Sequence, residues 1–308
     1  MKYRQLSGAD LRLSLVGMGC ASFWGKSNFS EKHAIEVFAA AAASGINYYD
    51  TGSSYSGGHA EQRLGRALHA HPDGKDAVIS SKAGTRIGRW GKLYNDFSPA
   101  WIRQSCENSL RHLQIDHIPI FFLHGPNPED FTAALFEELE QLQKAGKIGL
   151  IGVNAFAEPS LQSCFDFPQI QCIMLDFNIY QPQRCEMIKQ FKAAGKNVFV
   201  AGALAGAIYD DRFWRFQGRK SLWYWLRAWK NNPQLKAMKK QMKFLNDSPN
   251  LTATQLALAY VLNNPDLSTA LVGSTRVEHM QELLQAVDVQ LEPALIKRIE
   301  SQAQQLGL

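Results

Sequence analysis

The chain has 308 residues, a length that suits one (β/α)8 barrel or two smaller domains. Its residues are 45% hydrophobic and 20% charged, which allows a large core and excludes an intrinsically disordered chain. The formal net charge of +5 is mild and dispersed, so it is compatible with an anionic small ligand but gives no support to nucleic-acid binding.

Short apolar segments alternate with helix-like segments along nearly the whole chain. Each apolar segment is rich in β-branched and aromatic residues, which is typical of a strand buried on both faces. The predicted strands are residues 13–19, 46–51, 77–82, 117–124, 148–154, 172–178, 197–204 and 269–274. The predicted helices are residues 30–44, 59–69, 98–113, 131–145, 184–194, 252–263, 276–287 and 293–306. Ser98 followed by Pro99 predicts a helix start with a serine N-cap.

Strands that alternate with helices predict a parallel α/β fold, either a barrel or a doubly wound sheet. Polar residues occur at the C-terminal ends of strands from the beginning to the end of the chain, and in a barrel those ends share one rim. We therefore expect a (β/α)8 TIM barrel that forms a single domain over residues 1–308. Residues 2–12 are expected to form a hairpin that caps the bottom of the barrel.

One segment interrupts the regular alternation. Residues 205–251 separate the seventh strand from its helix and are unusually rich in Trp, Phe and Arg. A loop of this length inside a compact domain is typical of a functional lid or of small extra helices.

The five cysteines are Cys20, Cys106, Cys164, Cys172 and Cys185. They are widely spaced, and they lack both the close pairs of a zinc site and the density of a disulfide framework. The N-terminal segment lacks the apolar run of a signal peptide, and no run of about 18 apolar residues predicts a membrane span. We therefore expect reduced thiols, no metal site, no membrane association and a cytoplasmic location.

Four polar residues follow neighbouring predicted strands and carry the candidate chemistry: Asp50, Tyr55, Lys82 and His124. A free tyrosine has a pKa of about 10 and exchanges protons sluggishly near neutral pH. A lysine ammonium about 4 Å away favours the phenolate by roughly 4 kcal/mol at an effective dielectric constant of about 20. The carboxylate would keep the lysine charged and oriented, and the histidine would donate a hydrogen bond to a substrate carbonyl. Taken singly, each residue is equally typical of a cap, core or surface position, so the hypothesis rests on their combination.

The segment GINYYDTGSSYSGGHAEQRLGRAL, with VISSKAG and HIPIFFLHGP after it, resembles the aldo-keto reductase family. Similar blocks near the C-terminus extend the resemblance over essentially the whole chain. The resemblance implies a (β/α)8 barrel and hydride transfer between a nicotinamide and a carbonyl or alcohol. It assigns the general acid or base to Tyr55, its tuning to Lys82 and Asp50, and the orientation of the carbonyl to His124.

The resemblance also implies cofactor residues on the later strands, where this chain departs from the family's pattern. Asn154 and Ala155 stand where a serine and an asparagine commonly hold the nicotinamide carboxamide, and Met174 replaces a glutamine. Asn154 alone offers both a donor and an acceptor. Leu204 completes this half of the expected cofactor site.

At the C-terminal end, Gly273, Ser274 and Thr275 are expected to bind the cofactor's phosphates at a helix start. The adenosine end is assigned to three further residues, Arg276, His279 and Glu282. The family's usual choice favours NADP(H), with Arg276 near the 2′-phosphate. A solvated charge at the helix start is the alternative for Arg276, and NAD(H) is the alternative cofactor.

The substrate is expected to be a small carbonyl compound or sugar. Phe23, Trp24, Trp90 and Phe156 occur on the predicted rim loops, where they form either an aromatic wall of the substrate site or ordinary loop packing. Residues 212–229 either close over cofactor or substrate or form the interface of a homo-oligomer, whose typical composition is aromatic residues with arginine.

Two other functions are compatible with the residues. The departures at Ala155 and Met174 fit a regulatory or redox-sensing subunit that binds the cofactor with little turnover. The second alternative is an enzyme of the same barrel fold that uses Lys82 as a Schiff-base nucleophile. The pairing of Asp50 with Tyr55 argues against this alternative.

Overall fold

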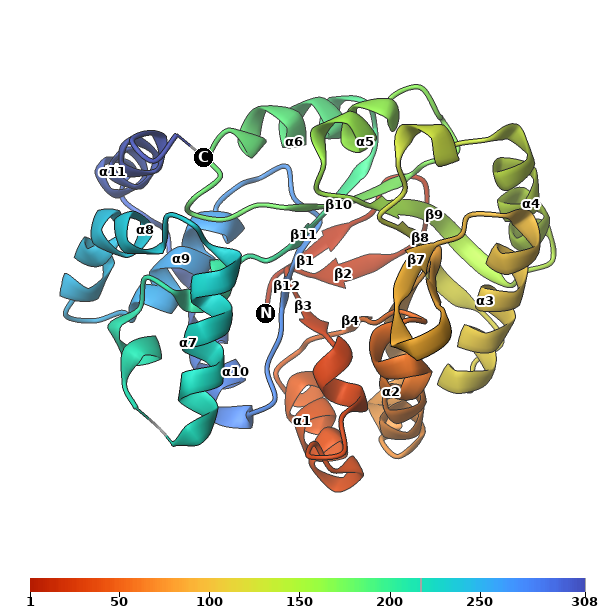
Figure 1. The fold of residues 1–308 in the computed structure, drawn as a ribbon, viewed down its shortest axis with the longest axis horizontal. Helices are drawn as coiled ribbons and strands as arrows, with labels where there is room; N and C mark the ends of the chain where they lie inside the picture. Colours follow the sequence, from red (N-terminus) through yellow and green to blue (C-terminus); the bar gives the residue numbers. More distant parts are fainter. Residues whose placement is uncertain (217, 308) are drawn as a thin grey trace.

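A computed structural model describes residues 1–216 and 218–307, so Gln217 of the long segment and the terminal Leu308 lie outside the described residues. Eight parallel strands close into a barrel (Figure 1), and they follow one another around it in chain order. They are β3 (Val16–Gly19), β4 (Tyr48–Asp50), β5 (Val78–Ala83), β8 (Ile118–His124), β9 (Ile148–Asn154), β10 (Cys172–Asp176), β11 (Asn197–Ala201) and β12 (Thr269–Val272). The predicted (β/α)8 barrel is therefore confirmed, and each barrel strand lies within a predicted one except β5, which extends one residue further, to Ala83.

Helices surround the barrel and mostly coincide with the predicted ones. They are α1 (Glu31–Ala43), α2 (His59–His69), α3 (Pro99–Leu113), α4 (Ala133–Lys144), α5 (Glu158–Ser163), α6 (Arg184–Ala193), α9 (Ala253–Leu262), α10 (Val277–Leu284) and α11 (Pro293–Gln304). The predicted start of α3 is confirmed, with Ser98 at the N-cap position and Pro99 as the first helical residue. Ser98 occupies the N-cap position, but its hydroxyl donates to Asp96 Oδ1 at 2.6 Å and makes no cap hydrogen bond.

The barrel interior is filled by large apolar side chains. Tyr48, Phe122, Met174 and Phe199 are buried together in one cluster with smaller neighbours from other strands. Because successive side chains of a strand alternate between its faces, the same inward faces end in polar residues at the C-terminal rim. The apolar interior thus supports a polar mouth at one end of the barrel.

The N-terminal hairpin closes the other end of the barrel. Strands β1 (Tyr3–Gln5) and β2 (Arg12–Ser14) pair in antiparallel fashion, and Leu6 and Leu13 belong to the cluster inside the barrel. Asn197, the first residue of β11, accepts from the Ser7 amide at 2.8 Å and donates to its carbonyl at 3.0 Å. The predicted hairpin cap is confirmed.

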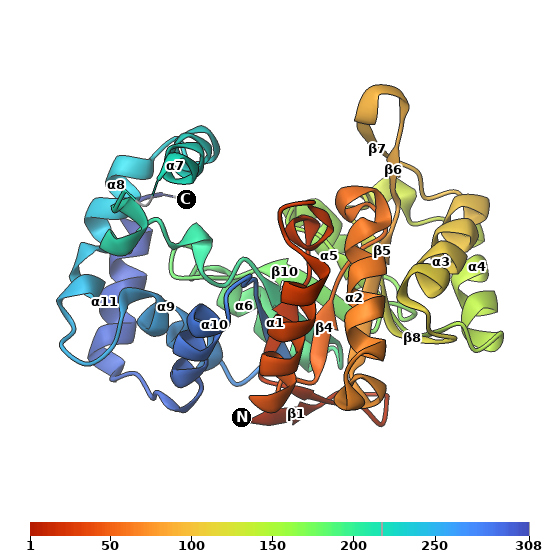
Figure 2. The ribbon, with the colours of Figure 1, turned by 90° about the horizontal axis from the view of Figure 1, so that it is seen from below.

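Two insertions interrupt the barrel. The first was not predicted, and for the second the sequence left two alternatives. A second hairpin, β6 (Thr85–Ile87) and β7 (Leu93–Asn95), follows β5 and projects on the side opposite β1 (Figure 2). The long segment after β11 folds into α7 (Arg219–Asn231), α8 (Leu235–Gln241) and short 3₁₀ turns. The sequence predicted either a functional lid or small extra helices for this segment, and the structure contains extra helices. In the described part of the chain, no helix is both long and apolar enough to cross a membrane.

Truncating the hairpin's core residue tests how much the cap contributes to stability. Leu13 is fully buried, so Leu13→Ala should lower the free energy of unfolding by about 2–5 kcal/mol, as deletions of buried leucines do. Denaturant unfolding measures the change. Asp10→Ala, at an exposed position of the same hairpin, should change it by less than about 0.5 kcal/mol. Equal effects of the two substitutions would contradict the sealing role of Leu13.

Candidate functional site

A buried ion pair forms the base of the mouth. Lys82, near the end of β5, is only 1% exposed, and its Nζ donates to Asp50 Oδ2 at the end of β4 and to the Thr51 carbonyl at 2.7 Å. The other carboxylate oxygen, Asp50 Oδ1, accepts from Ser80 Oγ at 2.7 Å, and Ser80 Oγ is itself 2.7 Å from the Tyr48 hydroxyl. These contacts hold the ammonium in one place and satisfy the carboxylate around it.

The lysine keeps its charge in this environment. Burial alone lowers the pKa of Lys82, but the Asp50 carboxylate and the Tyr55 hydroxyl more than offset it, so the pKa lies above its usual value. Lys82 Nζ lies 5.2 Å from the centre of the Tyr55 ring. The site therefore presents a fixed positive charge beside a tyrosine.

A tight turn after β4 presents that tyrosine. Tyr55 begins a 3₁₀ turn, η2 (Tyr55–Gly58), in which Ser56 and Gly57 have left-handed φ values of 51° and 66°. Ser56 Oγ donates to the Ser22 carbonyl at 2.5 Å, which ties this turn to the loop after β3. Gly52 allows the close approach, because a Cβ there would lie 3.3 Å from the Tyr55 ring.

His124 completes the predicted group from the end of β8. Its ring lies 5.6 Å from the Tyr55 ring, centre to centre, in an edge-to-face arrangement, and its Nδ1 is 3.3 Å from Thr85 Oγ1. Burial, together with the charge of Lys82, lowers the pKa of His124 to about 4. The imidazole is therefore neutral near pH 7 and can donate or accept one hydrogen bond without carrying charge.

The structure thus brings Asp50, Tyr55, Lys82 and His124 together at one mouth. Sequence reasoning missed Ser80, although its position two residues before Lys82 places it on the same face of β5. It also missed the support behind that strand. The fully buried Glu61 of α2 accepts from Ser81 Oγ at 2.6 Å and lies 3.1 Å from His112 Nδ1, which anchors the outer face of β5.

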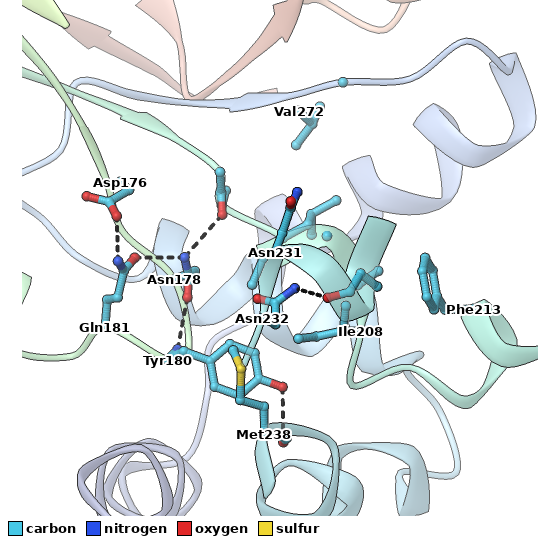
Figure 3. Close-up of a pocket in the computed structure, with 18 of the residues that line it drawn as sticks. Asp176, Asn178, Tyr180, Gln181, Ile208, Phe213, Asn231, Asn232, Met238 and Val272 are labelled. Atoms are coloured by element: carbon cyan, nitrogen blue, oxygen red, sulfur yellow. Dashed lines mark hydrogen bonds between the residues drawn. The ribbon is translucent and has the colours of Figure 1, made fainter. Parts of the chain in front are cut away.

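A large cavity of about 950 Å³ lies at the C-terminal ends of the later barrel strands, and Figure 3 shows the residues that line it. It extends from the ends of β10, β11 and β12 to α7 and α10, and three of the predicted cofactor residues line it: Leu204, Gly273 and His279. Its volume lies at the upper end of the range of small-molecule and cofactor pockets. The cavity therefore has the volume of a cofactor pocket, although none of Asp50, Tyr55, Lys82 and His124 is among the described residues that line it.

The three residues predicted to hold the nicotinamide carboxamide are Asn154, Ala155 and Met174, and their side chains differ in what they can bind. Asn154 Nδ2 donates to the Met174 carbonyl at 3.1 Å, and the Ala155 amide donates to the same carbonyl at 3.0 Å. The Met174 side chain is 1% exposed and belongs to the barrel interior. Of the three, only the Asn154 side chain carries groups that hydrogen-bond a ligand.

The loop between β12 and α10 is stabilised by its own side chains. Ser274 Oγ donates to the Arg276 carbonyl at 2.8 Å and accepts from the Arg276 amide at 3.1 Å. The Thr275 carbonyl lies 2.6 Å from Nε2 of His33 on α1, and Arg276 is the N-cap residue of α10. The hydroxyl of Ser274 is thus committed to the loop, which leaves the backbone of the helix start for an anionic ligand.

The residues predicted for the adenosine end lie beside Arg212, which was not among the predicted site residues. Glu282 Oε1 accepts from Arg212 Nη1 at 2.7 Å and from Thr252 Oγ1 at 3.0 Å, and Arg212 also pairs with Asp210. Burial lowers the pKa of His279, although the Glu282 carboxylate acts against it. Arg212 thus joins the segment after β11 to α10. Because the two residues of this contact are 70 positions apart in the chain, the sequence alone contains no signal for it.

The four predicted substrate aromatics are not equivalent. Trp24 is 1% exposed and packs against Phe29 in the core, so loop packing describes it and a pocket wall does not. Trp90 is fully exposed between β6 and β7, Phe156 is exposed after β9, and Phe23 is half-buried next to Trp24. Three of the four thus remain at the surface of the rim.

The low pKa of His124 predicts a pH-dependent contribution to stability. Between about pH 6.5 and pH 4 the unfolded chain binds a proton at this residue that the folded chain does not, so its contribution is full above 6.5 and is lost as pH falls toward 4. The unfolding free energy of wild type minus that of His124→Asn should therefore decrease on acidification across this range. Denaturant unfolding at each pH measures the difference, and a constant difference would contradict the low pKa.

This sequence and this fold are similar to those of known proteins. Residues 15–304 match the model of the aldo/keto reductase family. The uncharacterized oxidoreductase YqkF of Bacillus subtilis is 26% identical over 99% of this chain and 97% of its own length. The NADH-specific methylglyoxal reductase of Escherichia coli is 26% identical over 96% of each chain. The holo form of aldo-keto reductase AKR11C1 from Bacillus halodurans superposes with a TM-score of 0.79, at 24% identity over 99% of this chain and 96% of that chain. This chain therefore belongs to the aldo/keto reductase family, whose members are oxidoreductases that use nicotinamide cofactors.

Proposed function

We propose that this oxidoreductase moves a hydride between NADP(H) and a small carbonyl compound or sugar alcohol, with Tyr55 as the general acid and base. The observation that carries the proposal is the buried Lys82–Asp50 pair beside Tyr55, with the neutral His124 ring against the same tyrosine. When bound, the nicotinamide supplies or accepts the hydride. The chain's own residues handle the proton and the position of the substrate oxygen.

In the direction of reduction, Tyr55 donates its hydroxyl proton to the carbonyl oxygen as the carbon receives a hydride, and the product is an alcohol. The phenolate left behind is stabilised by the Lys82 ammonium, which Asp50 holds in place. The neutral imidazole of His124 donates a hydrogen bond to the substrate oxygen and so orients the carbonyl toward the tyrosine. Solvent then returns a proton to Tyr55. Oxidation of an alcohol follows the same steps in reverse.

For the cofactor, we propose that Asn154 holds the carboxamide with Ala155 and Met174 beside it, while Leu204 and Gly273 flank the dinucleotide. The backbone of Ser274 and Thr275 would meet the phosphates. Arg276, His279 and Glu282 would hold the adenosine end, with Arg276 near the 2′-phosphate of NADP(H). A relative named as NADH-specific keeps NAD(H) as the alternative.

We further propose that residues 1–308 act as one domain in the cytoplasm and that Phe23, Trp90 and Phe156 contribute to the substrate wall. The alternative function is a regulatory or redox-sensing subunit with little turnover, which the apolar Met174 and Ala155 would favour. The two functions differ in whether the reaction depends on Tyr55.

Removing the Tyr55 hydroxyl tests the catalytic role. Tyr55→Phe should lower kcat by about 10²–10⁴-fold, the usual contribution of a general acid or base, while cofactor affinity stays within about twofold. Steady-state reduction of a panel of aldehydes and sugars gives kcat, and calorimetric titration gives the affinity. Tyr94→Phe, at an exposed tyrosine of β7, is the matched control and should keep wild-type rates. Unchanged turnover in Tyr55→Phe would refute the mechanism.

Titration with both cofactors tests the preference. Wild type should bind NADPH more tightly than NADH, because the 2′-phosphate adds a charge-assisted contact with Arg276. Arg276→Ala should reduce the ratio of the two affinities severalfold, whereas Arg89→Ala, on the distant hairpin, should leave it unchanged. A wild-type preference for NADH would reject the NADP(H) assignment.

A further inference from the structure

Positive charge is concentrated in one segment of the chain. Residues 212–246, which include α7 and α8, contain ten lysines and arginines and no aspartate or glutamate. The whole chain has a net charge of +5, so all other residues together carry −5. The positive charge is therefore concentrated, whereas the composition alone suggested that it is dispersed. The part of the surface formed by α7 and α8 is the part that attracts an anionic partner.

Six of these cations are exposed and have no carboxylate partner. Of the other four, Arg212 pairs with Asp210 and Glu282. Lys239 lies 3.3 Å from Asp211. The six exposed cations form no ion pair with any residue that the structure describes, and they are Arg215, Arg227, Lys230, Lys236, Lys240 and Lys243. Their charge is thus available to an anionic partner outside the chain.

Helix α7 turns its large apolar residues toward solvent. Leu222, Leu226 and Trp229 recur at helical spacing, so they form one stripe along the helix, and they are 49%, 71% and 63% exposed. The opposite face carries Tyr224 and Asn231, which line the cavity. A helix that packs only against its own protein has its apolar residues on the inner side. The exposed stripe therefore indicates a partner that is apolar where it meets α7.

Contacts on a third side of α7 hold the helix in this orientation. Trp225 Nε1 donates to the Phe213 carbonyl at 2.9 Å, and the Trp225 ring stacks with that of Trp214 at a distance of 6.3 Å between centres. Ala228, on the same side of the helix, is buried in the main hydrophobic core. The exposure of the stripe is thus a consequence of how α7 is packed.

Cations border the apolar stripe. Lys230 is exposed and comes directly after Trp229. The Arg227 guanidinium lies 5.5 Å from the centre of the exposed Trp223 ring, and Lys26 Nζ, from the loop after β3, lies 5.7 Å from the same centre. An apolar stripe of leucine and tryptophan with lysine and arginine at its border is typical of a helix that lies in a membrane interface.

The β6–β7 hairpin is a second apolar projection from the same rim. It follows β5, and α7 follows β11, and the C-terminal ends of barrel strands share one rim. Figure 2 shows both elements on the side of the molecule opposite β1. Ile87 and Leu93 of the hairpin are exposed, and Arg89 and Lys92 form no ion pair with any residue in the described ranges. Both projections thus present apolar residues and cations on one side of the molecule.

We propose that α7 docks this protein on an anionic lipid surface, with Leu222, Leu226 and Trp229 in the interface and the neighbouring cations against the headgroups. Tryptophan is enriched at the headgroup level of bilayers, and each lysine or arginine near an anionic leaflet adds attraction. The sequence led us to expect no membrane association because it contains no spanning segment, but a helix that lies in the interface does not span the bilayer. Docking is independent of the cofactor and of the reaction.

The charge and composition of residues 212–246 favour a lipid surface over a protein partner. A second copy of the chain would bring the same ten cations against one another, and like charges across an interface are unfavourable. Six of the ten are lysines, which are depleted in protein interfaces. A lysine can lay its apolar stem along the interface while its ammonium reaches the headgroups. An anionic lipid surface therefore fits this segment better than the interface of a homo-oligomer does.

Co-flotation of the full-length chain with lipid vesicles tests the proposal. The wild type should bind vesicles of phosphatidylcholine with about 30 mol% phosphatidylserine about tenfold more strongly than vesicles of phosphatidylcholine alone. High salt should weaken this binding, because it screens the attraction between the cations and the headgroups. The double substitution Leu226→Ser with Trp229→Ser should lower the partition coefficient by about tenfold, and Lys230→Glu should lower it severalfold.

Tyr3→Ser is the matched control, because it removes an exposed aromatic residue of β1 on the opposite side of the molecule, and it should leave partitioning unchanged. Binding to neither kind of vesicle, or equal binding by the wild type and the double variant, would overturn the proposal. Equal binding to both kinds of vesicle at all salt concentrations would overturn the role of the cations. Without vesicle binding, a dimer that the double variant abolishes would assign the surface to a second copy, and retention on poly-glutamate would assign it to an acidic protein.

Discussion

The buried pair of Lys82 and Asp50 is the interaction on which the rest of the site depends. Two charges removed from water gain little stability from each other, because desolvation offsets most of their attraction. Removal of either partner, however, would leave an uncompensated charge in the barrel. The hydrogen bonds from Ser80 and to the Thr51 carbonyl satisfy the remaining groups of the pair. Such a pair is better explained by the position it gives to the ammonium, beside Tyr55, than by its contribution to stability.

That position requires the barrel to be assembled accurately. β4 and β5 are neighbours whose register pairs Asp50 with Ser80, so Lys82 extends one layer further toward the mouth. Behind β5, the Glu61 carboxylate fixes Ser81, and below it the apolar interior excludes water from the pair. The same burial that keeps the pair dry lowers the pKa of His124 to about 4. One environment thus leaves the lysine charged and the histidine neutral, because only the lysine has a carboxylate partner.

The barrel and the four polar residues could be predicted because they depend on local patterns. β-branched strands, glycine after helices and polar residues at strand ends are each readable within a few positions. The rest depends on long-range contacts. The Ser98 hydroxyl makes no cap hydrogen bond because it donates to Asp96, and Trp24 is buried because it packs against Phe29. The inward face of α7 could not be predicted either, since helical spacing defines two faces but does not indicate which one meets the cavity.

The two halves of the site consequently differ in how they hold a ligand. The acid–base half comes from adjacent strands and is fixed by short hydrogen bonds. The proposed cofactor half comes from distant segments, and at its proposed carboxamide end the side chains of Met174 and Ala155 offer no hydrogen bond comparable to that of an amide. Asn154 has already committed its Nδ2 to the Met174 carbonyl, which leaves its Oδ1 for a ligand. A cofactor bound as proposed would therefore draw more of its affinity from its charged phosphates than from its carboxamide.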